Sequence, residues 1–300
     1  MKLSALAKFS AFGLSTIMFR RKKPILGTII LTDKCNLYCR HCAVNNVHSV
    51  IYPYEQIKRE MESLYKMGVR ILFFSGGETL MWEDSGKTVR DLVIEAKQRG
   101  FLIVNIVTNG TFPIDLPEAD LILLSLDGGR EVHNFIRGDT YDLILKNIRE
   151  ATAANICFYM AVNRLNKHEI PAVCGVAKSE PNVKAVSFNF HTPYPGTEEL
   201  SLTAEDKEVC CKTVRDMKKR GYPIFNLISA FPYLLKNKYK RPCRQCVVIE
   251  NGRLSTCGRC IHNPGLCQNC GYIFAVEYSL IFAGKIRVIW DMLNTYLRYI

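Results

Sequence analysis

The sequence has 300 residues, of which 48% are hydrophobic and 23% are charged, a composition typical of a folded globular protein. A chain of this length can bury a large core, so its 13 cysteines are not needed as the disulfide staples of a small secreted domain. The net charge of +12 would suit nucleic-acid binding, but the interleaved aromatic and basic residues of such a protein are absent, so we expect no nucleic-acid partner.

The chain begins with an apolar stretch, residues 3–19, followed by four basic residues at 20–23. A signal peptide is not expected because no small-residue cleavage site follows. Lys8 interrupts the run, whose length is at the short limit for a membrane span. Two interpretations of residues 1–23 stay open. In the first, these residues form a helix that packs on the core. In the second, they form an apolar-basic helix that holds a cytoplasmic protein against the inner face of an anionic membrane.

From residue 25 onward, nearly continuous apolar segments alternate with segments of helical periodicity. Strands are predicted at residues 25–32, 70–77, 101–110, 119–129, 156–163 and 184–191, and helices at residues 53–68, 88–100, 141–154 and 168–180. Buried strands that alternate with helices indicate a parallel sheet. We therefore predict an α/β fold, a partial (β/α)6 TIM-like barrel over residues 24–205, with functional side chains at the carboxyl ends of its strands. The polar residues at these ends are Thr32, Ser75, Asn109, Ser125, Asn163 and His191.

Three cysteines follow the first predicted strand, in the segment DKCNLYCRHC. Cys35, Cys39 and Cys42 are spaced to bind three irons of a 4Fe–4S cluster, which leaves the fourth iron open. Zinc is the alternative, and it would take His41 or His48 as its fourth ligand.

The second predicted strand ends in FFSGGET. Gly76 and Gly77 would let the backbone approach a ligand closely, and Glu78 can pair with an ammonium group. CxxxCxxC after the first strand and GGE after the second resemble the motifs of radical S-adenosylmethionine (radical SAM) enzymes. The segments VTNG (107–110), LSLDGGREVHNFIRG (124–138) and VNRLNKHEI (162–170) extend this resemblance, which covers about residues 25–200.

The resemblance implies that Cys35, Cys39 and Cys42 hold a 4Fe–4S cluster that reductively cleaves S-adenosylmethionine (SAM) to a 5′-deoxyadenosyl radical. This radical abstracts a hydrogen atom from the substrate. A flavodoxin or ferredoxin would supply the electron. The SAM contacts implied are His41 at the adenine, Gly76, Gly77 and Glu78 at the methionine moiety, and Ser125 and Asn163. Asn109 and His191 are further candidates for the cofactor site because of their position at strand ends.

A second group of cysteines forms three CxxC pairs: Cys243, Cys246, Cys257, Cys260, Cys267 and Cys270. Three such pairs indicate metal binding, for which a zinc ribbon is one form. The segment NGRLSTC (251–257) resembles the SPASM and twitch extensions of radical SAM enzymes. We therefore predict an auxiliary iron–sulfur domain at residues 206–300, with one auxiliary 4Fe–4S cluster and two clusters as the alternative. Cys243, Cys246 and Cys257 also resemble the three-cysteine auxiliary site of the molybdopterin precursor synthases.

The four remaining cysteines are predicted to be small buried hydrophobic residues: Cys157, Cys174, Cys210 and Cys211. Near the C-terminus, an apolar stretch precedes an amphipathic helix whose apolar residues are Ile286, Ile289, Trp290, Leu293, Leu297 and Ile300. This helix packs on its own domain or contacts a membrane.

The apolar-basic ends favour a membrane lipid or another apolar molecule as the substrate. The alternatives are modification of a peptide or protein and oxidation of a small metabolite. Only about 24 residues precede the first strand, so a leader-binding domain ahead of the barrel is not expected. A zinc-binding module without enzymatic activity is the most distant alternative, because it leaves the GGE motif unexplained.

Overall fold

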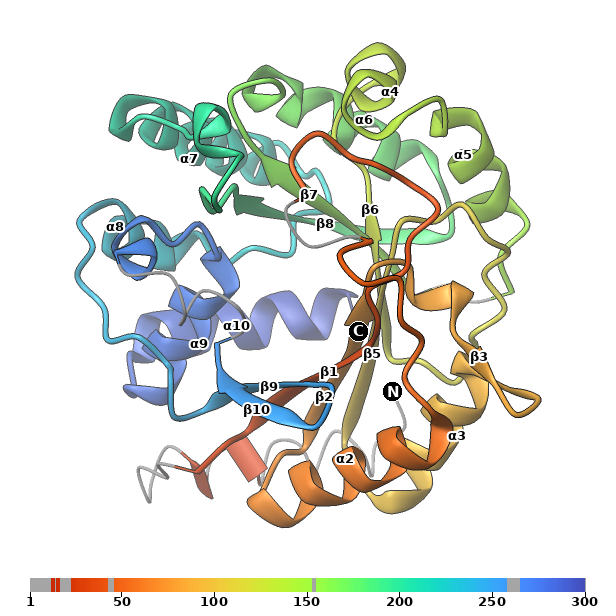
Figure 1. Cartoon of the computed structure of the whole chain (residues 1–300). Coiled ribbons are helices and arrows are strands. Elements are labelled where there is room, and N and C mark those ends of the chain that lie inside the picture. The colour runs from red at the N-terminus through yellow and green to blue at the C-terminus, as the bar shows by residue number, and fades with distance from the viewer. Residues whose placement is uncertain are drawn as a thin grey trace.

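The computed structural model describes residues 12–13, 15–16, 23–42, 46–152, 155–257 and 265–299 (Figure 1). Eight strands form one sheet in the order β10-β9-β1-β2-β5-β6-β7-β8. The sheet has two ends and is therefore an open, partial barrel. Most of the predicted N-terminal helix and Cys260 lie outside the described residues.

All six predicted strands are present, and each pairs in parallel with its neighbour in the chain order of the prediction. They are β1 (Leu26–Thr32), β2 (Ile71–Gly76), β5 (Ile103–Thr108), β6 (Leu121–Ser125), β7 (Ile156–Val162) and β8 (Val183–Phe190). The predicted α/β partial barrel is thereby confirmed. A short hairpin, β3 (Glu83–Asp84) and β4 (Lys87–Thr88), forms a separate sheet that was not predicted.

The four predicted helices are also present: α2 (Tyr54–Met67), α3 (Val89–Arg99), α5 (Tyr141–Arg149) and α6 (Ile170–Ser179). Thr88 and Asp91 form a capping box at the start of α3, which satisfies backbone N–H groups that have no partner within the helix. α5 ends at Arg149, which is earlier than predicted. After this end, the Thr152 N–H donates to the Ile114 carbonyl at 3.3 Å instead of to a carbonyl of the helix. α4 (Arg130–Arg137) was not predicted.

Side chains of the parallel strands alternate between two faces of the sheet. One face carries Ile29, Leu72 and Phe74 and packs against the helices in the main hydrophobic core. The other face carries Thr28 and Phe73 and lines a cavity. Figure 1 shows α9 (Ile273–Phe282) and α10 (Ile286–Tyr299) to the left of the strands, with α3 and α5 to the right.

The C-terminal third of the chain extends the same sheet. After α7 (Ala204–Lys219) and α8 (Phe231–Leu235), β9 (Cys246–Glu250) pairs in parallel with β1, and β10 (Arg253–Thr256) folds back against β9. The N–H groups of Ile25 and Leu26 both bond to the Gln245 carbonyl, at 2.8 and 3.0 Å. Both edges of β1 are therefore paired. The boundary predicted at residue 206 stays a prediction.

Phe12 and α9 meet near the start of the barrel strands. Phe12 packs on a cluster that contains Ile25 and Leu26, together with Tyr278 and Phe282 of α9, so this part of the N-terminal segment contacts the core. None of the helices in the described ranges is long and apolar enough to cross a membrane. The prediction that four cysteines are buried hydrophobes is confirmed for Cys157, Cys174, Cys210 and Cys211.

Candidate functional site

The cysteine loop, residues 33–42, follows β1 at the carboxyl end of the barrel. Buried Asp33 accepts hydrogen bonds from the His48 N–H at 2.5 Å and the Val50 N–H at 2.7 Å. The Cys35 N–H donates to the Asn46 side-chain oxygen at 2.8 Å. These contacts fix the loop before any ligand binds.

The two glycines after β2 bring this strand end against the cysteine loop. The Gly77 N–H donates to the Thr32 carbonyl at 2.7 Å, and the Glu78 N–H donates to the Lys34 carbonyl at 2.9 Å. A Cβ on Gly76 would overlap the Thr32 carbonyl oxygen, and one on Gly77 would overlap that of Lys34. The two glycines therefore allow two backbone segments to pack closely together. The sequence predicted a different reason for them, namely close approach of the backbone to a ligand.

Glu78 joins the ends of two strands. Its Oε1 accepts from the Thr108 hydroxyl at 2.6 Å and the Leu80 N–H at 2.9 Å, and its Oε2 accepts from the Asn109 N–H at 2.6 Å. Burial raises the pKa of this carboxyl. Both oxygens are used within the protein, so the structure shows Glu78 as a residue that positions Asn109; pairing with an ammonium group stays a prediction.

N–H donors point at two of the three sulfur atoms. Cys35 Sγ lies 3.5 Å from the Leu37 nitrogen and 3.8 Å from Asn109 Nδ2. Cys39 Sγ lies 3.7 Å from Nη1 of Arg137. Burial raises the pKa of Cys35, and that of Cys39 to about 11, so metal binding must displace the thiol protons. Such donors suit thiolates in an iron–sulfur site, so the loop fits a cluster.

A buried ion pair between Arg137 and Asp127 contacts the loop at Cys39. Arg137 of α4 donates from Nε to Asp127 Oδ2 at 2.5 Å, and Asp127 Oδ1 accepts from the Ala161 N–H at 3.0 Å. Although burial opposes ionisation, Arg137 holds the pKa of Asp127 below its ordinary value. The sequence interpretation did not find this pair. The part of the sequence that indicates this pair is the segment LSLDGGREVHNFIRG, in which Asp127 and Arg137 stand at the two ends of a short turn and helix.

His41 has one ring nitrogen in contact with this pair and one without a partner. Nε2 lies 3.4 Å from Nη2 of Arg137 and must accept, because a guanidinium has no acceptor. Nδ1 is buried without a hydrogen-bond partner among the described residues. Burial, with Arg137 and His191 nearby, lowers the pKa of His41 to about 4. A neutral His41 therefore presents Nδ1–H as a donor, which fits a ligand bound beside the loop.

The other residues predicted at the strand ends have different hydrogen-bond partners. Asn109 Nδ2 also donates to the Asn36 side chain at 2.9 Å. Asn163 accepts from the Leu165 N–H at 2.9 Å and donates to the Ala161 carbonyl at 3.0 Å, which shapes the turn after β7. His191 Nε2 lies 3.0 Å from the Thr197 hydroxyl, and Ser125 ends β6.

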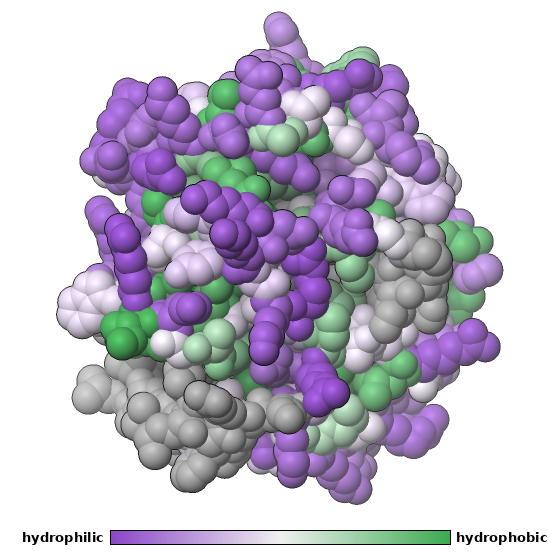
Figure 2. Space-filling model, turned by 90° about the vertical axis from the view of Figure 1, so that its left-hand side faces the viewer, coloured by the Kyte–Doolittle hydropathy of each residue, from purple (hydrophilic) through white to green (hydrophobic). Residues whose placement is uncertain are grey.

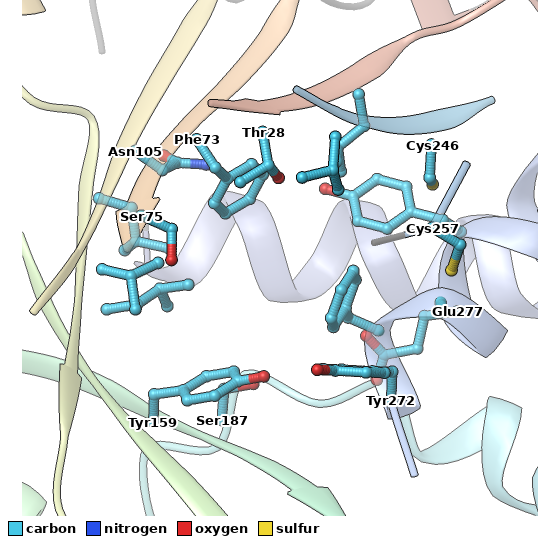
Figure 3. A pocket seen from close by; sticks show the side chains of 18 of the residues that line it. Thr28, Phe73, Ser75, Asn105, Tyr159, Ser187, Cys246, Cys257, Tyr272 and Glu277 are labelled. Atoms are coloured by element: carbon cyan, nitrogen blue, oxygen red, sulfur yellow. The ribbon is translucent and has the colours of Figure 1, made fainter. Parts of the chain in front are cut away.

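A cavity of about 380 Å³ lies between the inner face of the sheet and the C-terminal segment (Figure 3). Its walls are mainly apolar. The polar side chains that reach it include Asn105, Tyr159, Tyr272 and Glu277. Glu277 is buried, and its Oε1 accepts from the Leu227 N–H at 2.8 Å; burial raises the pKa of this carboxyl to about 7. One end of the cavity reaches Ser75 and Gly76, beside the cysteine loop.

The cysteine hairpin, residues 243–257, borders the same cavity. Cys246 begins β9, Cys257 follows β10, and the Cys257 N–H donates to the Cys246 carbonyl at 3.1 Å. Both cysteines line the cavity (Figure 3). Burial, with Cys243 nearby, raises the pKa of Cys246 to about 12. Strand pairing thus brings Cys246 and Cys257 together, and Cys243 lies near Cys246.

The remaining predicted ligands follow the hairpin. Cys267 is exposed and Cys270 is half-buried. Across the described ranges, no three or more His, Cys, Asp or Glu side chains are arranged to hold a single metal ion. The predicted auxiliary ligand set stays a prediction.

An open parallel barrel with a cysteine loop after its first strand has the architecture of the radical SAM proteins. The sequence matches the radical SAM superfamily over residues 29–177, and the chain is a radical SAM enzyme of this superfamily. Membership implies a 4Fe–4S cluster and SAM as cofactors.

Two curated relatives come from Methanosarcina barkeri. The chain is 28% identical to its Fe-coproporphyrin III synthase over 225 residues, which cover 67% of this chain and 54% of that protein. It is 24% identical to its AdoMet-dependent heme synthase over 279 residues, which cover 86% of this chain and 78% of that protein. The chain thus spans about half the length of the first of these relatives.

The fold is similar to that of solved structures. The Streptococcus suis SuiB, bound to its precursor peptide SuiA, has a TM-score of 0.64 at 15% identity and covers 93% of this chain and 71% of its own. Methylornithine synthase has a TM-score of 0.55 at 15% identity, with 95% and 89% covered. These similarities support the partial-barrel fold.

Proposed function

We propose that this enzyme abstracts a hydrogen atom from a mainly apolar substrate held in the cavity. Cys35, Cys39 and Cys42 would hold a 4Fe–4S cluster, which would supply the electron for reductive cleavage of SAM to methionine and a 5′-deoxyadenosyl radical. The observation that carries this proposal is the continuity of the apolar cavity with the strand end at Gly76, beside the cysteine loop. A substrate there would lie close to the SAM site.

The residues of the loop have separate parts in this proposal. The three cysteines hold the cluster, and His41 donates from Nδ1 to the adenosyl group of SAM. Gly76, Gly77 and Glu78 hold the end of β2 where the methionine moiety would bind. Ser125, Asn163, Asn109 and His191 complete the wall at the strand ends. A flavodoxin or ferredoxin in the cytoplasm would donate this electron to the cluster.

The substrate class follows from the walls of the cavity. Apolar side chains from the sheet and α9 favour an apolar molecule over a small polar metabolite, and the few polar groups would fix its orientation. The names of the two Methanosarcina barkeri relatives make an iron porphyrin the first compound to test. A membrane lipid is the second, and modification of a peptide or protein is the alternative.

The cysteine hairpin provides the proposed auxiliary site. Cys243, Cys246 and Cys257 would bind one 4Fe–4S cluster through three irons, and a cluster there would border the cavity. Cys260, Cys267 and Cys270 would complete its ligands or hold a second cluster. This site would accept an electron from the substrate or bind the substrate directly.

The first experiment tests the cofactors. Anaerobic reconstitution with iron and sulfide should give roughly eight irons per chain if two cubanes form. Dithionite and SAM should then yield 5′-deoxyadenosine. Bound zinc without a brown chromophore would contradict the proposal.

The second experiment tests the substrate class. We expect Fe-coproporphyrin III to accelerate 5′-deoxyadenosine formation, and a phospholipid dispersion to do so if the substrate is a lipid. Acceleration only by short peptides or by small polar metabolites would contradict an apolar substrate.

A further inference from the structure

α10 has two apolar faces, and only one of them is covered. Val288 is buried in a cluster with Leu280 and Ile281 of α9. Ile286 and Trp290, one helical turn apart, are 81% and 66% exposed, and Leu293 continues the same stripe. The sequence alone leaves open whether the apolar residues of this helix pack on its own domain or contact a membrane. Ile289 does so, whereas these three side chains face outward.

A basic groove runs beside this apolar stripe. Its lining cations come from α7, the segment after α8, and the start of α10: Arg215, Lys236, Lys238, Lys285 and Arg287. The single carboxylate among the lining residues is Asp291, which accepts from the Ser229 N–H at 3.0 Å and hydroxyl at 2.9 Å and pairs with Lys218 at 3.8 Å. Among the described residues that line it, the groove therefore carries five cations and one carboxylate, which is itself paired.

Figure 2 shows the side of the molecule to which α8 and α10 belong. Hydrophobic side chains reach the surface there between hydrophilic ones. Trp290 and Ile286 also line the groove, so the apolar stripe and the cations share one surface, which we call the α10 surface (Arg215, Lys236, Lys238, Lys285–Arg287, Trp290 and Leu293).

We propose that the α10 surface docks the enzyme on an anionic lipid membrane. Lys and Arg side chains would contact the head groups, and Ile286, Trp290 and Leu293 would enter the boundary between head groups and acyl chains. Tryptophan is favoured at that depth because its ring is amphipathic. An acidic protein would satisfy the cations, but only one with an exposed apolar patch beside its acidic residues would also cover the apolar stripe, whereas an anionic membrane offers both.

The placement of the surface allows docking during turnover. The α10 surface is built from α7, α8 and α10, whereas the cysteine loop lies between β1 and α2. Docking therefore needs no residue of the proposed cluster or SAM site, and the proposal does not depend on the radical chemistry. A membrane-bound enzyme would receive an apolar substrate from the lipid phase without passage through water.

The two tryptophans of the chain make the test direct. Trp82 is 1% exposed and donates from its indole to the Tyr52 carbonyl, so a change in emission on vesicle binding reports Trp290. We expect a blue shift and loss of iodide quenching with vesicles of phosphatidylglycerol and phosphatidylcholine. Pure phosphatidylcholine vesicles should give a much smaller change, and high salt should reverse the effect.

Variants separate the two parts of the surface. Lys236→Gln with Lys238→Gln should weaken binding to anionic vesicles about 30-fold, since each charge near the surface contributes about fivefold. Ile286→Ser should reduce the blue shift, and Trp290→Ser should reduce flotation with vesicles. The matched controls are Lys178→Gln with Lys184→Gln, and Val209→Ser on α7, whose side chain is 57% exposed.

Each outcome decides the proposal. A blue shift that Ile286→Ser and the lysine variants reduce, together with flotation that Trp290→Ser reduces, supports the proposal when the controls leave both unchanged. Flotation without a change in Trp290 emission would overturn it, because another part of the chain would then bind the vesicles. Absence of binding to anionic vesicles, with retention on an acidic protein column, would also overturn it in favour of a protein partner.

Discussion

The cysteine loop and the cysteine hairpin both adjoin β1, the loop after its carboxyl end and the hairpin along one edge, but different forces hold them. The loop is fixed by buried polar contacts: Asp33 and Glu78 accept backbone N–H groups, and Arg137 reaches Cys39. The hairpin is held by strand pairing with β1. We therefore expect the loop to respond to single changes of charge and the hairpin to respond to changes of packing.

The largest expected effect separates the two groups of cysteines by chemistry. Cys39→Ala should reduce 5′-deoxyadenosine formation to background, because the SAM-binding cluster loses a ligand. Cys246→Ala should lose about half of the iron, roughly four atoms per chain, and still cleave SAM without substrate. Iron analysis and chromatography of 5′-deoxyadenosine check both.

Cys174→Ala is the control for these variants, since Cys174 is buried in the core behind the sheet. It should keep the iron and the activity. Full SAM cleavage by Cys39→Ala would show that the loop is not the primary cluster site.

The second effect concerns the buried charges behind the loop. Arg137→Gln should lower the free energy of unfolding of the apo-protein by about 3–5 kcal/mol, because Asp127 then stays buried without its partner. Arg130→Gln on the same helix should cost at most about 1 kcal/mol, since Arg130 and Asp142 form an exposed pair. Urea unfolding measures both, and equal losses would remove the contrast between buried and exposed pairs.

The third effect lies on the hairpin side of the cavity and depends on pH. Burial raises the pKa of Glu277 to about 7, so the folded state holds this proton more tightly than the unfolded state does. Its contribution to stability is complete below the unfolded pKa of about 4.3 and is lost as pH rises through 7, by roughly 4 kcal/mol in total.

Glu277→Gln tests this pH dependence because the amide keeps an oxygen for the Leu227 N–H. Urea unfolding of the variant should show a smaller fall in stability between pH 5 and pH 8 than the wild type. An identical fall in both proteins would show that Glu277 ionises normally.

The smallest effect tests packing of the segment after the cysteine hairpin against β8. A Cβ on Gly271 would overlap the Phe190 carbonyl at the end of β8, so Gly271→Ala should cost about 1–3 kcal/mol. Gly175→Ala, within α6 and with open space around it, should instead stabilise the protein by up to about 1 kcal/mol. Thermal unfolding distinguishes the two, and a neutral Gly271→Ala would show that this approach relaxes easily.

Local sequence patterns were sufficient for the six barrel strands and for α2, α3, α5 and α6, but not for α4. Buried parallel strands are nearly all apolar, and Gly68 and Gly100 end their helices in the left-handed conformation. The pairing of β9 with β1 joins residues far apart in the chain, and no local pattern encodes such a register.

The candidate site was predictable in its motifs but not in its contacts. Spacing identified Cys35, Cys39 and Cys42, whereas the Asp127–Arg137 pair depends on how α4 turns back toward the loop. The periodicity of α10 predicted a helix but not which apolar side chains face inward. Val288 occupies the core position, and Trp290 does not.

The pairing of β1 on both edges has a consequence for synthesis of the protein. While the chain is still on the ribosome, the edge of β1 that will receive β9 stays open until residues 246–250 have emerged, long after the cysteine loop has been made. An open strand edge can pair with a neighbouring chain. Nascent chains that stall before this point would therefore be the forms most prone to aggregate.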